Sequence, residues 1–499
     1  MKKIKYIYTG LLTVIILTAN SCQLTEELDD YKPKYALEVD EAIQNEASAE
    51  LALVGVYSAF RQQSSPAAFP IMFLVPDVLS GYSTNGPSSA ASVEALGWAS
   101  NNPLAMGASN TRGIYTGLYD LINRSNWLIE KVSELNDAVF PTPGRRAQIL
   151  AEAKTLRALG HFYLLRNFGQ FYDLNSEYGV LIRTAPVKNG TVTPRNTVAE
   201  TYASIISDLN EGIANGPDLR SKKYTNKTFA KGLKARVLLY QGKYQEAATL
   251  CQDIITNANA NFKLEPTYAA IFDEHNSAAI FTSSEILFGS AGQSGAGLGI
   301  GNFYSGFSVT VTKNYKDLLA SSVTIGGQNI TIDTGRSPIF ITNTTYGGFY
   351  STKYSSYFTV GTFEMIYHMR MAEVYLILAE ASARANNAVT PQALQALNTI
   401  RTRAGATTST GNGFVTYPNT ISLSQFLTAV RYEKLAELHA EGGETWYDLI
   451  RYDYIDGFGA GFKVSDVKAT ATNKDKFILP IPQESIDAGG NVIKQNPSY

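Results

Sequence analysis

Two stretches of the chain repeat one helix–turn–helix pattern, and few folds accommodate such a repeat. In residues 229–258, FAKGLKARVLLYQGKYQEAATLCQDIITNA, one helix is expected to end near Gly242 and the next to start at about Tyr244. A helix, a G-x-Y turn and an Ala-bearing helix form the tetratricopeptide pattern. Residues 375–403 repeat the pattern, with Pro391 suited to the first turn of the second helix. The chain is therefore predicted to be mostly α-helical, with tetratricopeptide-like helix pairs stacked into a scaffold.

Other segments carry apolar residues at helical spacing and extend this scaffold. In ETYASIISDLNEGI, Tyr202, Ile205 and Leu209 fall on one face, and AQILAEAKTLRALGHFYLLRNFG has the same periodicity. We expect the scaffold to occupy residues 46–270 and to be completed by a final helix pair at 361–405, where Gly405 suits the C-terminal cap.

The segment between these parts has a different character. Residues 271–360 contain short apolar runs separated by Gly, Ser, Thr and Tyr, which favours short strands and loops. Loops this long are uncommon unless they bind something, so we expect an inserted, irregular ligand-binding subdomain here. Residues 406–499 form a C-terminal segment. Its KFILPIPQESI stretch cannot be a regular helix, because Pro480 and Pro482 interrupt it, and it should run extended over the body.

The N-terminus has the layout of a secretory signal. Lysines precede a short apolar run, which is far below the roughly 20 residues that span a bilayer. Ala19-Asn20-Ser21-Cys22 resembles a bacterial lipobox, although Ala19 stands where Leu is usual. We predict a lipoprotein signal peptide at 1–21, lipidation of Cys22, and a lipid-anchored tether at 22–45. The alternative is an ordinary signal peptide followed by an incidental Cys.

Several function classes find no support in the sequence. The net charge is −2 and no Lys/Arg run follows the signal, which argues against nucleic acid as a partner. The other cysteine, Cys251, lies on an apolar helical face and should be buried. The four histidines lack metal-ligand spacing, and no G-x-S-x-G elbow occurs. We therefore predict no enzyme activity, no metal and no cofactor.

One acidic pattern resembles a glycosidase pair at first sight. Glu433, Glu437 and Glu441 lie at i, i+4 and i+8 on one predicted helix face. Carboxylates on one helix face point the same way and cannot readily flank a glycosidic bond from both sides. We expect them to pair with Arg or Lys as structural groups.

Two loops carry the mixture of aromatic rings and amides that binds a sugar. A pyranose stacks its apolar face on a ring, and amide groups bond its hydroxyls. The candidate ligand-binding residues are Tyr82, Trp98, Asn101 and Asn102 in the first loop, and Tyr304, Phe307 and Tyr350 in the second. Trp98 is the one Trp outside predicted helices or their edges, whereas Trp127 and Trp446 are expected in the core. The alternative is that these rings pack beneath their own loops.

Four stretches together resemble the SusD/RagB family of nutrient-binding outer-membrane lipoproteins. They are AEAKTLRALGHFYLLRNFG (151–169), RMAEVYLILAEASARANN…ALQALNTIRTRAG (370–405), RYEKLAELHAEGGETWYDLIRY (431–452) and ILPIPQESIDAGGNVIKQNPSY (478–499). One departure lies in the third stretch, where the family usually reads E-G-x-R-W. This chain has Glu441-Gly442-Gly443-Glu444-Thr445-Trp446, one residue longer and without the Arg.

The resemblance implies a function. Members of this family cap a SusC-like TonB-dependent barrel transporter, capture an oligosaccharide or polysaccharide, and deliver it to the barrel. It also implies a lipid-anchored protein of the outer membrane, exposed at the cell surface. Three alternatives stay open: peptide or glycopeptide cargo with the same lid role, a periplasmic repeat scaffold that binds no nutrient, and a lipid-anchored hydrolase.

Overall fold

The computed structural model describes residues 42–61, 68–89, 92–258, 260–272, 281–293, 300–304, 308–333, 335–336, 341–343, 348–354, 363–405, 416–457 and 461–499. The predicted signal peptide and Cys22 lie outside these residues, as does Phe307. Helices dominate the described part, so the predicted mostly α-helical class is confirmed. None of the helices described there combines the length and the apolar character needed to cross a membrane.

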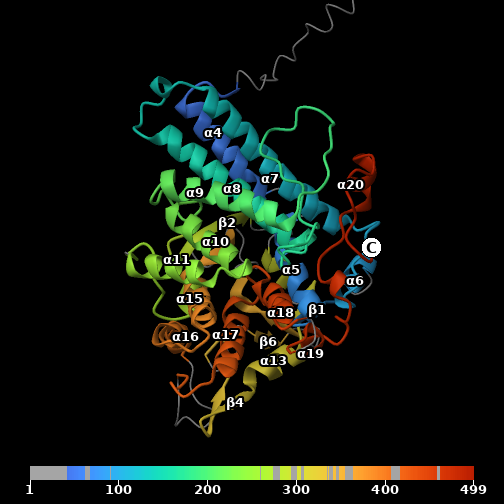
Figure 1. Ribbon diagram of the computed structural model, residues 1–499, viewed down its shortest axis with the longest axis vertical. Helices are drawn as coiled ribbons and strands as arrows, with labels where there is room; N and C mark the ends of the chain where they lie inside the picture. The colour runs from blue at the N-terminus through green and yellow to red at the C-terminus, as the bar shows by residue number, and fades with distance from the viewer. Residues whose placement is uncertain are drawn as a thin grey trace, which may run out of the picture.

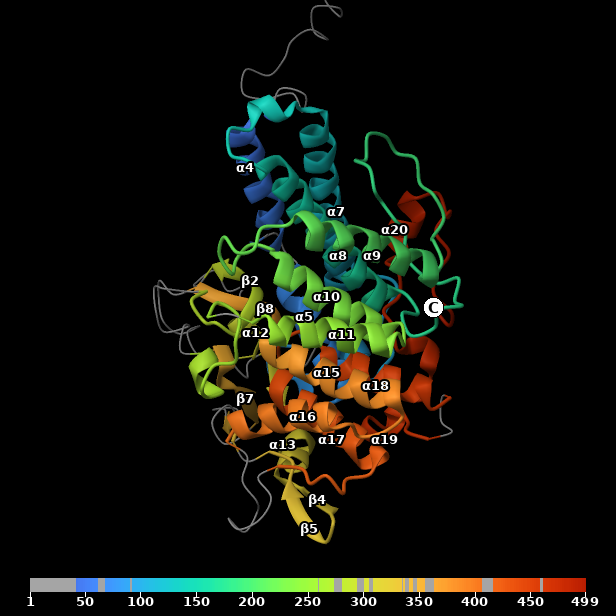
Figure 2. The same cartoon turned by 60° about the vertical axis from the view of Figure 1, so that its left-hand side comes forward.

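The scaffold begins as a row of antiparallel helices in which each contacts the next (Figures 1 and 2). Its first helices are α4 (Glu46–Tyr57), α7 (Ser109–Glu134), α8 (Arg145–Phe168), α9 (Val198–Asn215), α10 (Lys227–Tyr240) and α11 (Tyr244–Thr256). The predicted turn between α10 and α11 is confirmed, with Gly242 at a positive φ of 72° that suits glycine. Cys251 is buried on the inner face of α11, as expected.

The next helix against α11 is α15, which lies more than one hundred residues further along the chain. The second part of the scaffold consists of α15 (Met371–Asn386), α16 (Pro391–Arg403), α17 (Leu423–Leu438) and α18 (Glu444–Ile455). Thr390 caps the start of α16, Pro391 occupies its first turn, and Gly405 follows its end at a φ of 74°. The segment between α11 and α15 is thus inserted into the helix stack.

Short strands and helices make up this inserted segment. They are β2 (Ile286–Gln293), α12 (Ile300–Tyr304), β3 (Val309–Val311), α13 (Lys313–Ala320), β4 (Ser322–Ile325), β5 (Gln328–Thr331), β6 (Ile341–Asn343) and β7 (Phe349–Ser351). The β4–β5 hairpin projects at the end of the molecule opposite α4 (Figure 2). Its Gly326-Gly327 turn has two positive φ angles, as a two-residue hairpin loop requires.

Two pairings tie the inserted segment to its surroundings. Strand β2 pairs antiparallel with β8 (Phe363–Arg370), so this sheet crosses the boundary predicted at residue 360. Strand β1 (Ser83–Asn85) pairs with β3 and completes a four-stranded sheet of order β1-β3-β7-β6. Helices α5 (Ala68–Ser80) and α6 (Val93–Ala99) pack beside β1. The first predicted ligand loop is therefore part of the packed structure.

The C-terminal segment runs extended where prolines were expected to prevent a helix. Its buried apolar residues are Phe477, Ile478, Leu479 and Ile481. Leu479 N–H donates to the Asn167 carbonyl (2.7 Å), and the Asn496 amide donates to the Phe168 carbonyl (2.9 Å). These bonds satisfy carbonyls at the C-terminal end of α8, which lack partners within their own helix. Short elements complete the chain: η1 (Ser58–Arg61), η2 (Asp137–Val139), η3 (Ala269–Ile271), α19 (Val464–Val467), η6 (Lys474–Lys476) and α20 (Gln483–Ala488).

Candidate ligand-binding site

The structure places the rings of the first predicted loop in the core. Trp98 lies in helix α6 and is 4% exposed, and Tyr82 is 6% exposed, with its ring 5.4 Å from that of Tyr315. The expectation that Trp98 stands in an exposed loop is therefore wrong. Ser92 caps α6, and the helix buries Trp98 against α5 and β1. Neither ring offers an open face on which a sugar could stack.

The two asparagines after Trp98 differ in burial and in structural role. Asn101 is buried at a φ of 53°, and its amide donates to the Leu79 carbonyl (2.9 Å). Asn101 N–H bonds to the Trp98 carbonyl and Asn102 N–H to the Gly97 carbonyl, which is the Schellman pattern that ends a helix. Asn101 is thus a structural helix cap, whereas Asn102 is exposed.

The candidate residues of the second predicted loop also differ in their exposure. Tyr304 is 1% exposed, and its phenol donates to Asp77 Oδ2 (2.6 Å), so the predicted ligand contact is replaced by a core hydrogen bond. Tyr350 is half-buried in β7. Trp446 is buried, as predicted, but Trp127 is only half-buried, with the Lys188 ammonium 5.6 Å from its ring centre. Of the candidate rings that the structure describes, Tyr350 alone keeps accessible surface.

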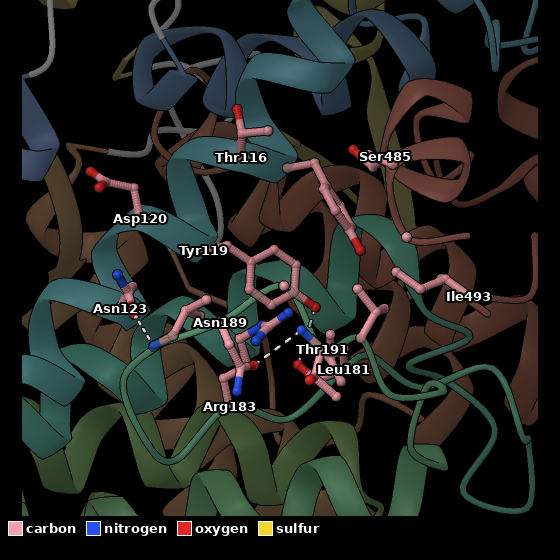
Figure 3. A pocket seen from close by; sticks show the side chains of 16 residues that line it. Thr116, Tyr119, Asp120, Asn123, Leu181, Arg183, Asn189, Thr191, Ser485 and Ile493 are labelled. Atoms are coloured by element: carbon pink, nitrogen blue, oxygen red, sulfur yellow. Dashed lines mark hydrogen bonds between the residues drawn. The ribbon is translucent and has the colours of Figure 1, made fainter. Parts of the chain in front are cut away.

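A cleft of about 550 Å³ lies elsewhere, between α7, the 181–192 loop and the C-terminal residues around α20 (Figure 3). We call it the α7–α20 cleft. None of the predicted ligand residues that the structure describes lines it. Its principal side chains are Tyr115, Thr116, Tyr119, Asp120, Asn123, Arg183, Asn189 and Thr191, closed on the far side by Ser485, Ala488 and Ile493.

Side chains of α7 hold the loop that forms one wall. Tyr119 donates its phenol to the Leu181 carbonyl (3.1 Å), and Asn123 Oδ1 accepts from Val187 N–H (2.9 Å). One turn further, Asn126 Nδ2 donates to the carbonyls of Arg183 (3.1 Å) and Ala185 (3.0 Å). Residues at i, i+4 and i+7 of one helix face thus fix the loop at three points. The cleft is formed by a pinned loop, which favours a preformed site.

The lining combines aromatic surface with hydrogen-bonding groups. The rings of Tyr115 and Tyr119 meet edge to face at 4.9 Å. Burial raises the pKa of the Tyr119 phenol well above its ordinary value, so it stays a neutral donor. Thr116 and Asn189 present polar side chains beside these rings (Figure 3). Such a surface suits a ligand that has both apolar faces and many hydroxyl groups.

Sequence reasoning missed this cleft, although one signal was present. The helix that carries Tyr115 and Tyr119 also carries Thr116, Asp120 and Asn123 on a neighbouring face. Polar and aromatic residues at i, i+4 and i+7 mark a helix flank that is neither core nor plain solvent surface. The signal could not reveal that the 181–192 loop folds over that flank.

The acidic pattern is structural, as predicted. Glu437 accepts from Arg370 Nη1 (3.0 Å), Arg403 Nη2 (2.5 Å) and Arg336 Nε (2.8 Å), and Glu433 pairs with Arg336. Burial alone would raise the pKa of Glu437, but the surrounding guanidinium groups outweigh it and hold the pKa well below its ordinary value. Within the described residues, no cluster of three His, Cys, Asp or Glu side chains is arranged to hold a metal.

The departure at residues 441–446 has a local explanation. Gly443 precedes α18 at a φ of 74°, and a Cβ there would lie 2.5 Å from Pro76 Cβ. Glu444, next to it, pairs with Arg166 and accepts from the Tyr240 phenol (2.8 Å). The buried charges are thus satisfied without an arginine in this turn.

Comparisons with known proteins agree with this architecture. One family model, described as the SusD family, matches residues 306–499, and a second, described as starch-binding associating with outer membrane, matches residues 81–239. A SusD-like protein of Bacteroides ovatus is 24% identical over 36% of this chain and 30% of its own length. The SusD-like protein P38 of Formosa agariphila is 25% identical over 59% of this chain and 53% of its own. The chain thus spans about half or less of the length of these curated relatives.

Solved structures match over nearly the whole chain. A putative sugar binding protein of Bacteroides vulgatus is 26% identical with a TM-score of 0.72, covering 92% of this chain and 99% of its own. A SusD superfamily protein of Bacteroides thetaiotaomicron is 24% identical with a TM-score of 0.70, covering 90% and 99%. A laminarin binding SusD-like protein is 23% identical with a TM-score of 0.66, covering 92% and 100%. For the two structures below 25% identity, the similarity shows a shared fold.

Proposed function

The chain belongs to the SusD/RagB family, and from this premise we propose that it binds an oligosaccharide or polysaccharide at the bacterial outer membrane and passes it to a SusC-like TonB-dependent transporter. In this proposal, lipidation of Cys22 anchors the protein at the cell surface. One acyl chain binds a membrane only marginally, and a lipoprotein carries two or three, which makes the anchorage stable.

The α7–α20 cleft is the observation that carries the binding half of the proposal. Its volume of about 550 Å³ falls within the range of sites for small ligands. Half-buried Tyr119 supplies aromatic surface, and Asn189 and Thr191 supply polar groups on the opposite loop. Asn102 and Tyr350 are proposed as additional contacts for a longer saccharide.

To test this proposal, a bulky side chain is introduced that fills the cleft without disturbing the core. Thr116 is exposed on α7, and its hydroxyl donates to the Arg112 carbonyl (2.9 Å). Thr249 is a matched control: it is exposed on α11, outside the cleft lining, and donates to the Gln245 carbonyl (2.9 Å). Thr116→Trp and Thr249→Trp therefore change equivalent helix positions, of which the first alone blocks the cleft.

Each variant is titrated calorimetrically with a panel of saccharides and of peptides. We expect Thr116→Trp to lose at least roughly tenfold in saccharide affinity, which corresponds to about 1.4 kcal/mol, with an unchanged melting temperature. Thr249→Trp should bind like the unaltered protein. Equal affinities in both variants would move the site away from the cleft, and binding of peptides alone would replace the saccharide by peptide cargo.

A further inference from the structure

Among the residues that the structure describes, the α7–α20 cleft contains one positive charge that no carboxylate neutralises. Arg183 lines the cleft and is half-buried, and its guanidinium lies 6.0 Å from the centre of the Tyr119 ring (Figure 3). Building on the proposed function, we propose that the saccharide selected here carries a negative charge, a carboxylate or a sulfate group, which the Arg183 guanidinium binds.

The backbone of Arg183 is fixed on both sides. Its N–H donates to His161 Nε2 (3.1 Å), and its carbonyl accepts from Asn126 Nδ2 (3.1 Å). Burial lowers the pKa of His161 to about 3, so its imidazole is neutral and accepts this bond. Two buried side chains thus hold the residue in place while its own side chain extends into the cleft.

The guanidinium has no anionic partner among the residues that the structure describes. Neighbouring arginines differ: Arg157 binds Asp208 through two bonds of 2.8 and 2.7 Å, and Arg166 pairs with Glu444. The one carboxylate that lines the cleft, Asp120, already pairs with Arg124 at 2.8 Å. The net charge presented to a ligand is therefore positive and is located at Arg183.

Chemistry favours an oxyanion as the partner of this group. A guanidinium offers parallel N–H donors that match the two oxygens of a carboxylate or the oxygens of a sulfate. Partial burial reduces screening by water and salt, so the interaction should be stronger than at an open surface. The half-buried ring of Tyr119 would contact the sugar ring while Arg183 holds its charged substituent.

The experiment compares ligands that differ in charge but little in shape. The intact protein is titrated with a short oligogalacturonate and with its methyl ester, and separately with a sulfated galactan oligosaccharide and with its desulfated form. We expect at least tenfold tighter binding of the charged member of one pair. The pair that shows the difference identifies the anion as carboxylate or sulfate.

Two variants assign the effect to the residue. Arg183→Gln should abolish the preference for the charged member of the pair. Lys243→Gln removes one charge from an exposed position beside the α10–α11 turn and should keep the preference, which controls for long-range electrostatics. Neutral saccharides bound as well as charged ones, or a preference that survives Arg183→Gln, would overturn the charge selectivity while the proposed function stands. Failure of every saccharide to bind would overturn both.

Discussion

Tyr304 donates a 2.6 Å hydrogen bond to the carboxylate of Asp77, and both side chains are buried. The bond joins α12 of the inserted segment to α5 of the scaffold, across 227 positions of sequence. Asp77 also accepts from Thr445 Oγ1 (3.2 Å) and from Ala440 N–H (3.1 Å). One carboxylate therefore connects the inserted segment, α5 and the turn that precedes α18.

Tyr304→Phe should weaken the fold and leave binding intact. The change removes the shortest of these bonds from a buried carboxylate, so we expect a loss of about 1–3 kcal/mol in the free energy of unfolding. Urea titration measures this loss, and calorimetry of the folded variant should show unchanged saccharide affinity. The control is Tyr350→Phe at a half-buried position, with an expected change within about 0.5 kcal/mol. Reduced affinity with full stability would return Tyr304 to the binding site.

Asp77 should make stability depend on pH. Burial raises its pKa from 3.8 to about 6, although the bonds from Tyr304 and Thr445 oppose the rise. The folded state therefore binds this proton more tightly than the unfolded state, and the contribution of Asp77 to stability falls as pH rises through the interval from about 4 to 6. The difference between the two pKa values corresponds to roughly 3 kcal/mol.

The measurement compares urea unfolding of the unaltered protein and of Asp77→Asn from pH 4 to pH 7. The amide that this substitution introduces cannot ionise, so the stability of the variant relative to the unaltered protein should increase by about 3 kcal/mol across this range. Parallel pH profiles would contradict the raised pKa. Neighbouring His439 should not change the difference between the two proteins, because burial lowers its pKa to about 3 and keeps it neutral in both folded states.

Sequence predicted those parts of the molecule that depend on neighbouring residues. The α10–α11 turn, the start of α16 at Pro391 and its end before Gly405 all follow from periodicity and capping within a few residues. The insertion between α11 and α15 followed from a change of composition.

The site could not be predicted in this way, because exposure depends on distant partners. The loop around Trp98 is rich in Gly, Ser and Asn, which suggested an open surface, yet α6 packs on α5 and β1. Tyr304 is buried because Asp77 lies opposite it. The α7–α20 cleft exists because Asn123 and Asn126 hold a loop that begins more than fifty residues later.

Trp98→Ala should destabilise the protein and should not reduce affinity per folded molecule. Removing a core Trp leaves a cavity, and the expected cost is about 3–5 kcal/mol. Trp98→Phe is the gentler control: among the residues that the structure describes, the buried indole N–H has no hydrogen-bond partner, so its removal costs no hydrogen bond and only volume is lost. Thermal melting and ligand titration on the same samples distinguish a core role of Trp98 from a ligand-stacking role. A melting temperature that stays constant while affinity falls would restore Trp98 as a stacking platform.

Cys22→Ser should release the protein from membranes without unfolding it. Cys22, the predicted site of the lipid anchor, lies outside the residues that the structure describes, and we expect the melting temperature not to change. Membrane and soluble fractions are compared by immunoblot, with Cys251→Ser as the control that leaves the anchor in place. Retention of Cys22→Ser in washed membranes would contradict anchorage through this residue.

Glu437→Gln should be among the most damaging changes in the scaffold. It leaves Arg336, Arg370 and Arg403 buried around a neutral amide, and loss of one partner from a buried ion pair typically costs about 3–5 kcal/mol. Because the folded pKa of Glu437 lies below its unfolded value, its contribution is complete above about pH 4.5 and is lost in stronger acid. The difference between the two proteins should therefore be large at pH 7 and should shrink as the pH falls below about 4.

The matched control is Glu177→Gln, which removes an exposed pair with Lys494 (2.6 Å). Solvent screens that pair, so the urea midpoint should not move. If both variants lost the same stability at pH 7, burial would not set the strength of these pairs. A strong effect confined to Glu437→Gln would show that the buried charges hold β8, α16 and α17 together, because Arg370 ends β8, Arg403 ends α16 and Glu437 belongs to α17.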